Sequence, residues 1–338
     1  MDITRRTFIA GVGATALAPT AHAAPRVRLP RALKSGDRVA IVAPAGLAEN
    51  QEHIDKSMAK VRSLGYEPVA YPNVLKNYGY LAGTDEERAA DLNAALRDPS
   101  IRGIFYLRGG YGAMRILPHL DYRAMKHDPK VTIGFSDVTA LHLAFLAKSD
   151  VVTFHGPCAE SSWSDFSRAT LGVMTSTEPF GVCTQAPDVP RTTLMPGAAE
   201  GRLVAGNLSL VTSLIGTDFC PSLRGAILAL EDIGEDPYRV DRMLTEILLS
   251  PKSHGLNGLV FGDFRERLRP GEVPEQIDPS RTFTLMQVLQ DRSRAFGVPS
   301  WSGLCFGHTR QNHILPLGVR VRLDADQQTL TILEKSVL

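Results

Sequence analysis

The sequence predicts an α/β fold whose first half is built on a mostly parallel sheet. Short apolar runs alternate with segments in which apolar residues recur at every third or fourth position, the pattern of buried strands followed by amphipathic helices. The apolar runs end in loops that contain glycine, proline or serine, as expected where a strand gives way to a helix. With 338 residues, the chain is long enough for two domains of ordinary size.

The composition limits the partners of the protein. Hydrophobic residues make up 43% of the chain and charged residues 22%, which describes a globular protein with an ample core. The formal net charge is +1, so the charge favours neither nucleic acid nor an anionic membrane as a partner. No apolar run of the mature chain is long enough to span a bilayer. Four widely spaced cysteines without a C-x-x-C motif are expected to be free, buried thiols: Cys158, Cys183, Cys220 and Cys305.

The first residues have the features of an export signal. Thr4–Ile9 is a twin-arginine pattern, Phe8–Leu17 is a mildly apolar stretch, and Ala21-His22-Ala23 is a small-residue cleavage pattern. The alternative is an N-terminal helix that is not removed. We expect residues 1–23 to be a twin-arginine signal peptide, with the mature protein beginning near Ala24 in a bacterial periplasm.

An N-terminal α/β domain is expected over residues 24–165. Its clearest helix start is Thr84, which forms a capping box with Glu87 three residues later. The expected elements are a strand at Arg38–Pro44, a helix at Glu49–Leu64, a strand at Tyr66–Tyr71, a helix through Leu96, strands at Ile101–Leu107 and Val131–Ile133, a helix from near Val138, and a strand at Val151–Phe154.

One turn of this domain is a candidate for chemistry. After the strand Val131–Ile133, Gly134 breaks the apolar pattern, and helical spacing begins near Val138. Ser136 therefore lies at a tight strand-to-helix turn, where free backbone N–H groups and the helix dipole favour negative charge. A nucleophile needs such a place if its reaction develops an oxyanion, although a serine before a helix is also an ordinary N-cap. The turn alone leaves both interpretations open.

Three loops of this domain are expected to meet. Sites in parallel α/β sheets form at the carboxyl ends of the strands. Ala43-Pro44, Arg108-Gly109-Gly110 and Phe135-Ser136 all follow predicted strands. We therefore expect these loops to converge at one edge of the sheet.

The second half begins after a segment without periodicity. Residues 166–200, rich in proline, threonine and glycine, are predicted to be a linker. A C-terminal domain is expected over residues 201–338. Its expected elements are a helix at Leu208–Ile215, a strand at Ala226–Leu230, an amphipathic helix at Pro237–Leu249, a strand at Leu259–Phe264, a helix at Thr284–Arg292, and a hairpin of Val319–Leu323 and Leu330–Leu333.

The second half offers two partners for Ser136. Acyl transfer by serine needs a base that takes the hydroxyl proton and an anion that holds the base in one tautomer. His308 lies in a loop after a short apolar run and a glycine, and Glu231 directly follows an apolar strand, where a carboxylate needs a partner or a function. Taken singly, His308 is also consistent with a surface-loop histidine and Glu231 with a capping carboxylate.

Other motifs fit less well. Gly134–Val138 lacks the last glycine of G-x-S-x-G, and the chain contains no H-E-x-x-H or Walker A sequence. His308 and His313 are five residues apart, a poor spacing for a metal on one helix face, and we expect no metal. His142 lies on the apolar stripe of its helix and is expected in the core, whereas His155 ends a neighbouring strand and is a candidate pocket residue.

A series of sequence blocks is informative as a set: SGDRVAIVAPAG, YLAGTDEERAADLNAAL, RGGYGAMRILPHLD, IGFSDVTALH, FHGP, GNLSLVTSLIGT, LEDIGEDPYRVDRML and FGHT. In this order they resemble the LD-carboxypeptidases, a serine peptidase family that includes muramoyltetrapeptide carboxypeptidase and the microcin-immunity peptidases. The resemblance covers nearly all of the mature chain, and several blocks in one order are far more specific than any single block.

The resemblance implies a role for each candidate residue. Ser136 would be the nucleophile, His308 the general base and acid, and Glu231 the residue that orients His308. The backbone N–H groups of Asp137 and Gly110 would form the oxyanion hole. The resemblance further implies that the protein needs no metal or cofactor and that it forms a homodimer. It implies a flavodoxin-like or amidotransferase-like N-terminal domain with a parallel sheet and a C-terminal swivelling domain of β/β/α type, with the site in the cleft between them.

The family reaction cleaves the bond between an L-configured centre, such as that of diaminopimelate or lysine, and a terminal D-alanine. A terminal carboxylate must then be bound, and Arg108, Arg239 and Arg242 are candidate donors. His155 and Asn207 are further candidate substrate contacts. Export would bring the enzyme to tetrapeptide stems of the wall or to fragments released from it.

Two other functions are considered. A peptidase with the same three residues could act on modified peptides or peptidyl-nucleotide antibiotics. A protein that binds wall peptides without catalysis would not need the three residues at all. The sequence thus favours a periplasmic serine carboxypeptidase that acts on peptidoglycan-derived peptides through an acyl-enzyme.

Overall fold

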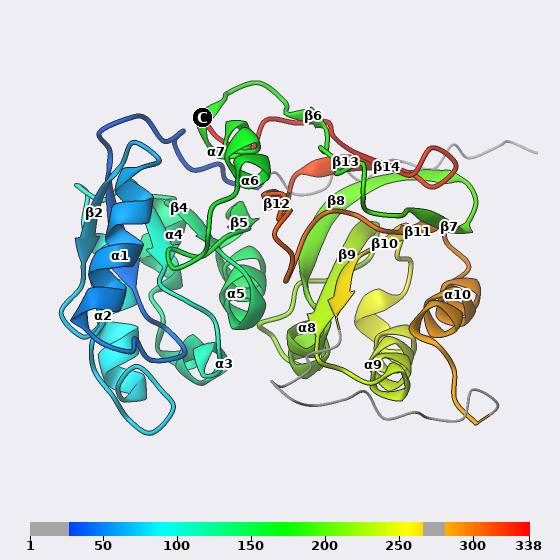
Figure 1. Cartoon of the computed structure of the whole chain (residues 1–338), viewed down its shortest axis with the longest axis horizontal. Helices are drawn as coiled ribbons and strands as arrows, with labels where there is room; N and C mark the ends of the chain where they lie inside the picture. Colours follow the sequence, from blue (N-terminus) through cyan, green and yellow to red (C-terminus); the bar gives the residue numbers. More distant parts are fainter. Residues whose placement is uncertain (1–26, 266–280) are drawn as a thin grey trace, which may run out of the picture.

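The computed structural model describes residues 27–265 and 281–338, and it contains two sheets that lie side by side (Figure 1). The predicted α/β class is confirmed, because strands and helices alternate in both halves and the centre of each sheet is parallel. The predicted signal peptide, residues 1–23, lies outside the described residues.

The first sheet has six strands in the order β12-β5-β4-β3-β1-β2. The five strands from the first half of the chain are parallel, as their alternation with helices predicts. These strands are β1 (Arg38–Val42), β2 (Glu67–Ala70), β3 (Gly103–Tyr106), β4 (Val131–Gly134) and β5 (Thr153–His155). The helices of this half are α1 (Gln51–Arg62), α2 (Asp85–Arg97), α3 (Ala113–Ile116), α4 (Tyr122–His127) and α5 (Thr139–Ser149).

The second sheet has eight strands in the order β6-β14-β13-β8-β9-β10-β11-β7. Its central strands are parallel and its outer strands antiparallel. The strands are β6 (Gly181–Val182), β7 (Thr192–Met195), β8 (Ala198–Asn207), β9 (Ala226–Ile233), β10 (Gly258–Arg265), β11 (Ser300–Ser302), β13 (Arg320–Asp324) and β14 (Thr329–Ile332). The helices that alternate with the parallel strands are α8 (Leu208–Ile215), α9 (Pro237–Leu249) and α10 (Leu285–Phe296).

Local chemistry sets the ends of several elements as predicted. The Thr84 hydroxyl accepts the Glu87 N–H at 3.2 Å, and the Glu87 carboxylate accepts the Thr84 N–H at 3.0 Å, which confirms the capping box of α2. Pro237 begins α9. Proline has no backbone N–H, and at this first position of a helix the N–H would have no partner within the helix. The closing hairpin is confirmed as the antiparallel pair β13–β14.

The segment expected to be a linker contains regular structure. It includes α6 (Asp165–Ala169), α7 (Gly172–Thr175) and the strands β6 and β7, which pair with β14 and β11 at opposite edges of the second sheet. Short edge strands bury few side chains and leave little periodicity in a sequence rich in proline and glycine. For this reason composition alone does not reveal them.

The two halves of the chain are interlocked. Strand β12 (Leu315–Leu317) leaves the second half and pairs antiparallel with β5 of the first sheet. At the start of α5, the Thr139 hydroxyl accepts the Asn207 N–H from the end of β8 at 3.0 Å. A Cβ on Gly206 would lie 2.3 Å from Thr139 Cγ2, so glycine is needed for this approach. The contact brings the end of β8 against the helix that follows the Ser136 turn.

A buried arginine braces the loops at the carboxyl edge of the first sheet. Arg88 on α2 is 1% exposed, and its guanidinium donates to the carbonyl oxygens of Pro44, Gly83 and Gly112 and to the Asp85 carboxylate. Pro44 follows β1, and Gly112 lies in the loop after β3. A buried cation is tolerated because all of these acceptors satisfy it.

Replacing Arg88 by methionine should lower the free energy of unfolding by about 2–5 kcal/mol, because three loop carbonyls lose a buried donor. The control is Arg97→Met on the same helix, whose side chain is 62% exposed and pairs with Asp121. That variant should lose less than about 1 kcal/mol. Urea denaturation measures both, and equal losses would contradict the bracing role of Arg88.

Candidate active site

Ser136 occupies a strained turn between β4 and α5. Its φ is +62°, in the left-handed region that residues other than glycine seldom adopt. Phe135 before it is extended, and a 3₁₀ turn over Ser136–Val138 leads into α5. Neither this turn nor α5 has a side-chain cap hydrogen bond, so the structure does not support Ser136 as an N-cap. Strain of this kind is typical of a nucleophile exposed at a strand-to-helix corner.

The loop after β3 lies directly against Ser136. A Cβ on Gly109 would lie 2.9 Å from Ser136 Cβ and 3.1 Å from Ser136 Oγ, so only glycine permits the contact. Gly110 follows with a φ of +108°, which again favours glycine. The Gly46 N–H donates to the Gly109 carbonyl at 3.0 Å. The loops after β1, β3 and β4 therefore meet, as predicted.

Asp137 fastens two of these loops to each other. Its buried carboxylate accepts the Ala113 N–H through Oδ2 at 2.7 Å. Burial raises the pKa of Asp137 to about 6, although the Ala113 N–H and the nearby guanidinium of Arg88 favour the ionised form. The predicted oxyanion donors, the N–H groups of Asp137 and Gly110, thus belong to loops that this carboxylate joins.

Glu231 and His308 form a hydrogen-bonded pair beside the end of β9. Glu231 is 0% exposed, and its Oε2 accepts the His308 backbone N–H at 3.2 Å and lies 2.7 Å from His308 Nδ1. A Cβ on Gly307 would lie 2.6 Å from Glu231 Cγ, so glycine lets the loop close over the carboxylate.

The surroundings of Glu231 keep it ionised. Burial raises the pKa of this carboxyl, but the imidazoles of His155 and His308 oppose that effect more strongly and lower the pKa to about 2. An ionised Glu231 favours the tautomer of His308 that carries its proton on Nδ1. Nε2 is then free to accept a proton.

The structure brings His308 to the Ser136 turn. Its ring lies edge-on to the ring of Phe135, the residue before Ser136, with 4.9 Å between centroids. Among the described residues, Ser136 and His308 make no hydrogen bond with each other, which is common in active sites without substrate. The three predicted catalytic residues thus lie in adjoining parts of one site although they come from two sheets.

His155 lies behind Glu231 and not on a pocket wall. Its ring is fully buried, with Nε2 3.8 Å from Glu231 Oε1, and it packs edge-on against Phe306. Within the described parts of the chain, neither ring nitrogen makes a hydrogen bond. A buried ring cannot touch a substrate, so the geometry gives His155 an electrostatic role beside the second carboxylate oxygen instead of the expected substrate contact.

Asn207 and Arg239, which were also expected to contact substrate, make hydrogen bonds and ion pairs within the protein. Asn207 is buried, caps α8 through its Oδ1, and donates from Nδ2 to Asp232 at 2.9 Å. Arg239 lies in the first turn of α9, 3.6 Å from the carboxylates of both Glu235 and Asp236. The geometry therefore assigns both side chains local structural contacts.

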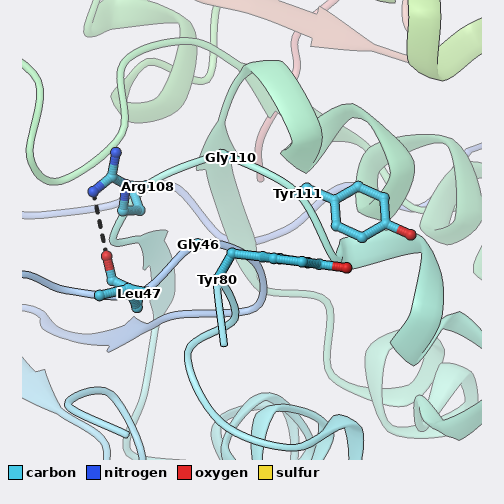
Figure 2. Close-up of a pocket in the computed structure, with 6 residues that line it drawn as sticks. All are labelled: Gly46, Leu47, Tyr80, Arg108, Gly110 and Tyr111. Atoms are coloured by element: carbon cyan, nitrogen blue, oxygen red, sulfur yellow. Dashed lines mark hydrogen bonds between the residues drawn. The ribbon is translucent and has the colours of Figure 1, made fainter. Parts of the chain in front are cut away.

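A pocket of about 480 Å³ lies beside the loop after β3 (Figure 2). Arg108, an expected substrate contact, lines it and donates to the Leu47 carbonyl at 3.2 Å. Across the pocket stand Tyr80 and Tyr111, exposed rings that meet edge-to-face with 5.7 Å between centroids. Sequence reasoning missed both tyrosines, because single exposed tyrosines in loops form no recognisable pattern. The lining residues are Gly46, Leu47, Tyr80, Arg108, Gly110 and Tyr111.

His308 itself lines a second pocket of about 300 Å³. Phe135 forms part of the wall, together with Ser161, Ser162 and Arg310. Phe135, on the wall of this pocket, precedes Ser136, and Gly109, which packs against Ser136, precedes Gly110 on the wall of the other pocket. The Ser136 turn therefore adjoins the walls of both pockets. Neither Arg310 nor the two serines carries a sequence signal that would have pointed to this site.

Two predictions outside the reacting centre are confirmed, those for His142 and for the cysteines. His142 is buried in α5 with Nε2 2.9 Å from the Gly134 carbonyl oxygen, and burial lowers its pKa to about 3. All four cysteines are free and buried. Within residues 27–265 and 281–338, no cluster of three or more His, Cys, Asp or Glu side chains could hold a metal ion. No helix in these ranges is long and apolar enough to cross a membrane.

Comparison with known proteins gives matches along most of the chain. A family model described as the LD-carboxypeptidase N-terminal domain matches residues 39–156, and one described as the LD-carboxypeptidase C-terminal domain matches residues 200–323. The "Probable murein peptide carboxypeptidase" of Bacillus subtilis is 34% identical over 309 residues, which cover 90% of this chain and 93% of that protein. The "Murein tetrapeptide carboxypeptidase" of Pseudomonas aeruginosa is 31% identical over 303 residues, with coverages of 86% and 94%.

A solved structure is also similar along most of its length. The crystal structure of muramoyltetrapeptide carboxypeptidase from Oxalobacter formigenes aligns with a TM-score of 0.73 at 30% sequence identity. The alignment covers 87% of this chain and 97% of that one. Both halves of the fold therefore have counterparts in a protein of known structure.

Asp137→Asn should make the stability less dependent on pH. The pKa of about 6 in the folded protein exceeds the ordinary value of 3.8, so the folded state retains a proton that the unfolded state loses. Ionisation of Asp137 therefore lowers stability as pH rises from about 4 to about 6. Asparagine keeps an acceptor for the Ala113 N–H but does not titrate. Relative to the wild type, the variant should gain about 1–3 kcal/mol between pH 4.5 and pH 7.5.

Urea denaturation of both proteins at the two pH values measures this gain. Asp55→Asn, on the exposed side of α1, is the control and should follow the wild-type pH dependence. An Asp137→Asn profile parallel to the wild type would show that the pKa of this carboxyl is not raised.

Proposed function

The chain belongs to the LD-carboxypeptidase family, and from this premise we propose that it is a serine LD-carboxypeptidase of peptidoglycan tetrapeptides. The bond cleaved joins an L-centre, that of diaminopimelate or lysine, to the terminal D-alanine. The observation that carries the proposal is the meeting of the strained Ser136 turn with the Glu231–His308 pair. The relatives named as murein peptide carboxypeptidases support the substrate class.

In the proposed reaction, His308 Nε2 takes the hydroxyl proton of Ser136 as the serine oxygen attacks the carbonyl carbon of the scissile amide. The carbonyl oxygen becomes an oxyanion, which in this proposal the N–H groups of Gly110 and Asp137 bind. When the C–N bond breaks, His308 gives its proton to the departing amine of D-alanine. The shortened peptide remains on Ser136 as an ester.

Water completes the cycle. His308 takes a proton from water as the water oxygen adds to the ester carbonyl, and the oxyanion forms again at the same donors. The tetrahedral intermediate then expels the Ser136 oxygen, which recovers its proton from His308. One water is consumed, and the products are the shortened peptide and free D-alanine.

Glu231 acts through His308. Its negative charge favours the imidazolium that forms in both steps, and its bond to Nδ1 leaves Nε2 available for proton transfer. The low pKa of Glu231 means that this support persists throughout the neutral pH range.

We further propose that the protein acts in the periplasm after export by the twin-arginine route. The motif over Thr4–Ile9 and the small-residue pattern before Ala24 support this location. There the enzyme would meet tetrapeptide stems on the wall or fragments released from it. The homodimer that the family resemblance implies remains a prediction.

Incubation of the purified protein with tetrapeptide muropeptides should remove one alanine from each stem, as seen by mass spectrometry. Ser136→Ala should lower kcat by about 10⁴- to 10⁶-fold, because the nucleophile is lost while the fold is kept. Ser213→Ala, an exposed serine on α8, is the control and should turn over normally.

The possible outcomes separate the hypotheses. Near-normal turnover by folded Ser136→Ala would exclude this serine as the nucleophile. Unchanged muropeptides with the wild type would exclude the proposed substrate. Cleavage of peptidyl nucleotides in their place would favour the antibiotic-directed alternative.

Glu231→Gln should lower kcat by about 10³- to 10⁴-fold with little change in KM, because the amide has the shape of the carboxylate but not its charge. Rates of alanine release measure both constants. Glu246→Gln, on the exposed side of α9, provides the matched control. A loss below tenfold in Glu231→Gln would show that the charge does not support His308.

A further inference from the structure

We infer that the pocket beside His308 receives the residue that the enzyme removes, and we propose that Arg310 binds its terminal carboxylate. The inference rests on the proposed function and adds to it the reason why cleavage stops at one terminal residue. Arg310 lies two positions after the general base, on the wall of this pocket.

The chemistry of the general acid fixes the side on which the leaving group lies. The imidazole that takes the serine proton later returns it to the departing amine. The departing residue must therefore lie against His308. His308 and Phe135 line the second pocket, whereas Gly110, a predicted oxyanion donor, lines the first. This geometry gives the second pocket to the departing residue and the first to the acyl part of the substrate.

The sizes of the two pockets agree with this division. The pocket beside His308 has a volume of about 300 Å³, against about 480 Å³ for the pocket beside Gly110. D-alanine is a small residue, whereas the acyl part is a longer peptide that continues toward the sugar. Trp163, which donates from Nε1 to the Cys158 carbonyl at 3.0 Å, is a fixed part of the smaller pocket.

The walls of the second pocket suit a carboxylate. The hydroxyls of Ser161 and Ser162 make no hydrogen bond with the described residues, so they are available to a ligand. Arg310 is exposed and makes no ion pair within the described ranges. None of the described residues that line the pocket is acidic. A carboxylate is bound well by hydroxyl donors together with a guanidinium that has no carboxylate partner of its own.

The loop that carries Arg310 is anchored next to the general base. The Ser164 hydroxyl donates to the Arg310 carbonyl at 2.8 Å, and the Asn312 side chain accepts the Gly307 N–H at 3.1 Å. His308 between them is bound to the buried carboxylate. In a terminal amino acid, the carboxylate is only two bonds from the departing nitrogen. Its anchor must then lie close to the group that protonates that nitrogen, and Arg310 meets this requirement.

The other arginines considered for this role have different surroundings. Arg108 lines the first pocket and lies 3.6 Å from the Glu160 carboxylate. Arg239 pairs with carboxylates in the first turn of α9. Arg242 lies over the ring of Tyr238 on the same helix. Arg310 alone among these four lines the pocket that contains the general base.

The test compares two tetrapeptides that differ only at the C-terminus, one with the free carboxylate of D-alanine and one with D-alanine amide. The wild type should prefer the free acid by roughly 10- to 100-fold in kcat/KM. Arg310→Gln should lose most of this preference, through a higher KM for the acid and little change for the amide, and Arg310→Lys should restore part of it. The control is Arg294→Gln, on the exposed side of α10.

An unchanged ratio of acid to amide turnover in Arg310→Gln would overturn the assignment. If the wild type released no alanine from either peptide, the proposed function would fail separately, and binding would then decide the role of the pocket. N-acetyl-D-alanine, titrated by NMR, should bind the wild type at least about tenfold more tightly than Arg310→Gln. Equal affinities would exclude Arg310 as the carboxylate anchor.

Discussion

The buried carboxylate of Glu231 is the constraint on which the rest of the site depends. A charge without exposed surface is costly unless hydrogen bonds and opposite charge offset its loss of water. His308 meets this need from both its backbone and its ring, and His155 stands near the second oxygen. These bonds fix the imidazole in one tautomer and one position. Because Glu231 sets the position of the imidazole, the first sheet must place Ser136 within reach of His308.

The first sheet reaches that position through contacts that only glycine allows. Gly206 meets the start of α5, Gly307 meets the carboxylate, and Gly109 meets the nucleophile. An added Cβ at these positions would lie 2.3, 2.6 and 2.9 Å from its nearest neighbour. In each contact the backbone of the glycine packs directly against the side chain of Thr139, Glu231 or Ser136, which leaves that side chain little room to move. Gly109 also lies directly before Gly110, one of the expected oxyanion donors, and donors that are in place before substrate arrives stabilise a transition state best.

The sequence predicted an element well where one buried face makes apolar residues recur at regular spacing. It predicted an element poorly where a strand pairs with a segment far away in the chain. α1, α8 and α9 agree to within a few residues because each buries one largely apolar stripe, and α2 agrees because its capping box marks its start. β12 was missed because its pairing with β5 depends on the other half of the chain. Within the site, polar residues at strand ends were recognised, but sequence does not say whether they face the cleft or the interior. Ser136 is partly exposed, whereas His155 and Asn207 are buried, and Arg310 became a candidate only when the pocket was known.

The strained backbone of Ser136 is surrounded by loops that the buried side chains of Arg88 and Asp137 connect through hydrogen bonds. A left-handed backbone at a serine costs about 1–3 kcal/mol and persists only if its neighbours prevent relaxation. Arg88 ties the loop after β1 to the loop after β3, and the Asp137 carboxylate ties the loop after β3 to the turn itself. The turn therefore cannot relax without breaking a buried hydrogen bond at one of these loops. Because Gly110 and Asp137 lie in the two segments that these bonds join, the network that supports the strained nucleophile also supports the expected oxyanion hole. A substitution in that network should therefore affect both together, even when it lies on α2 and outside the pockets.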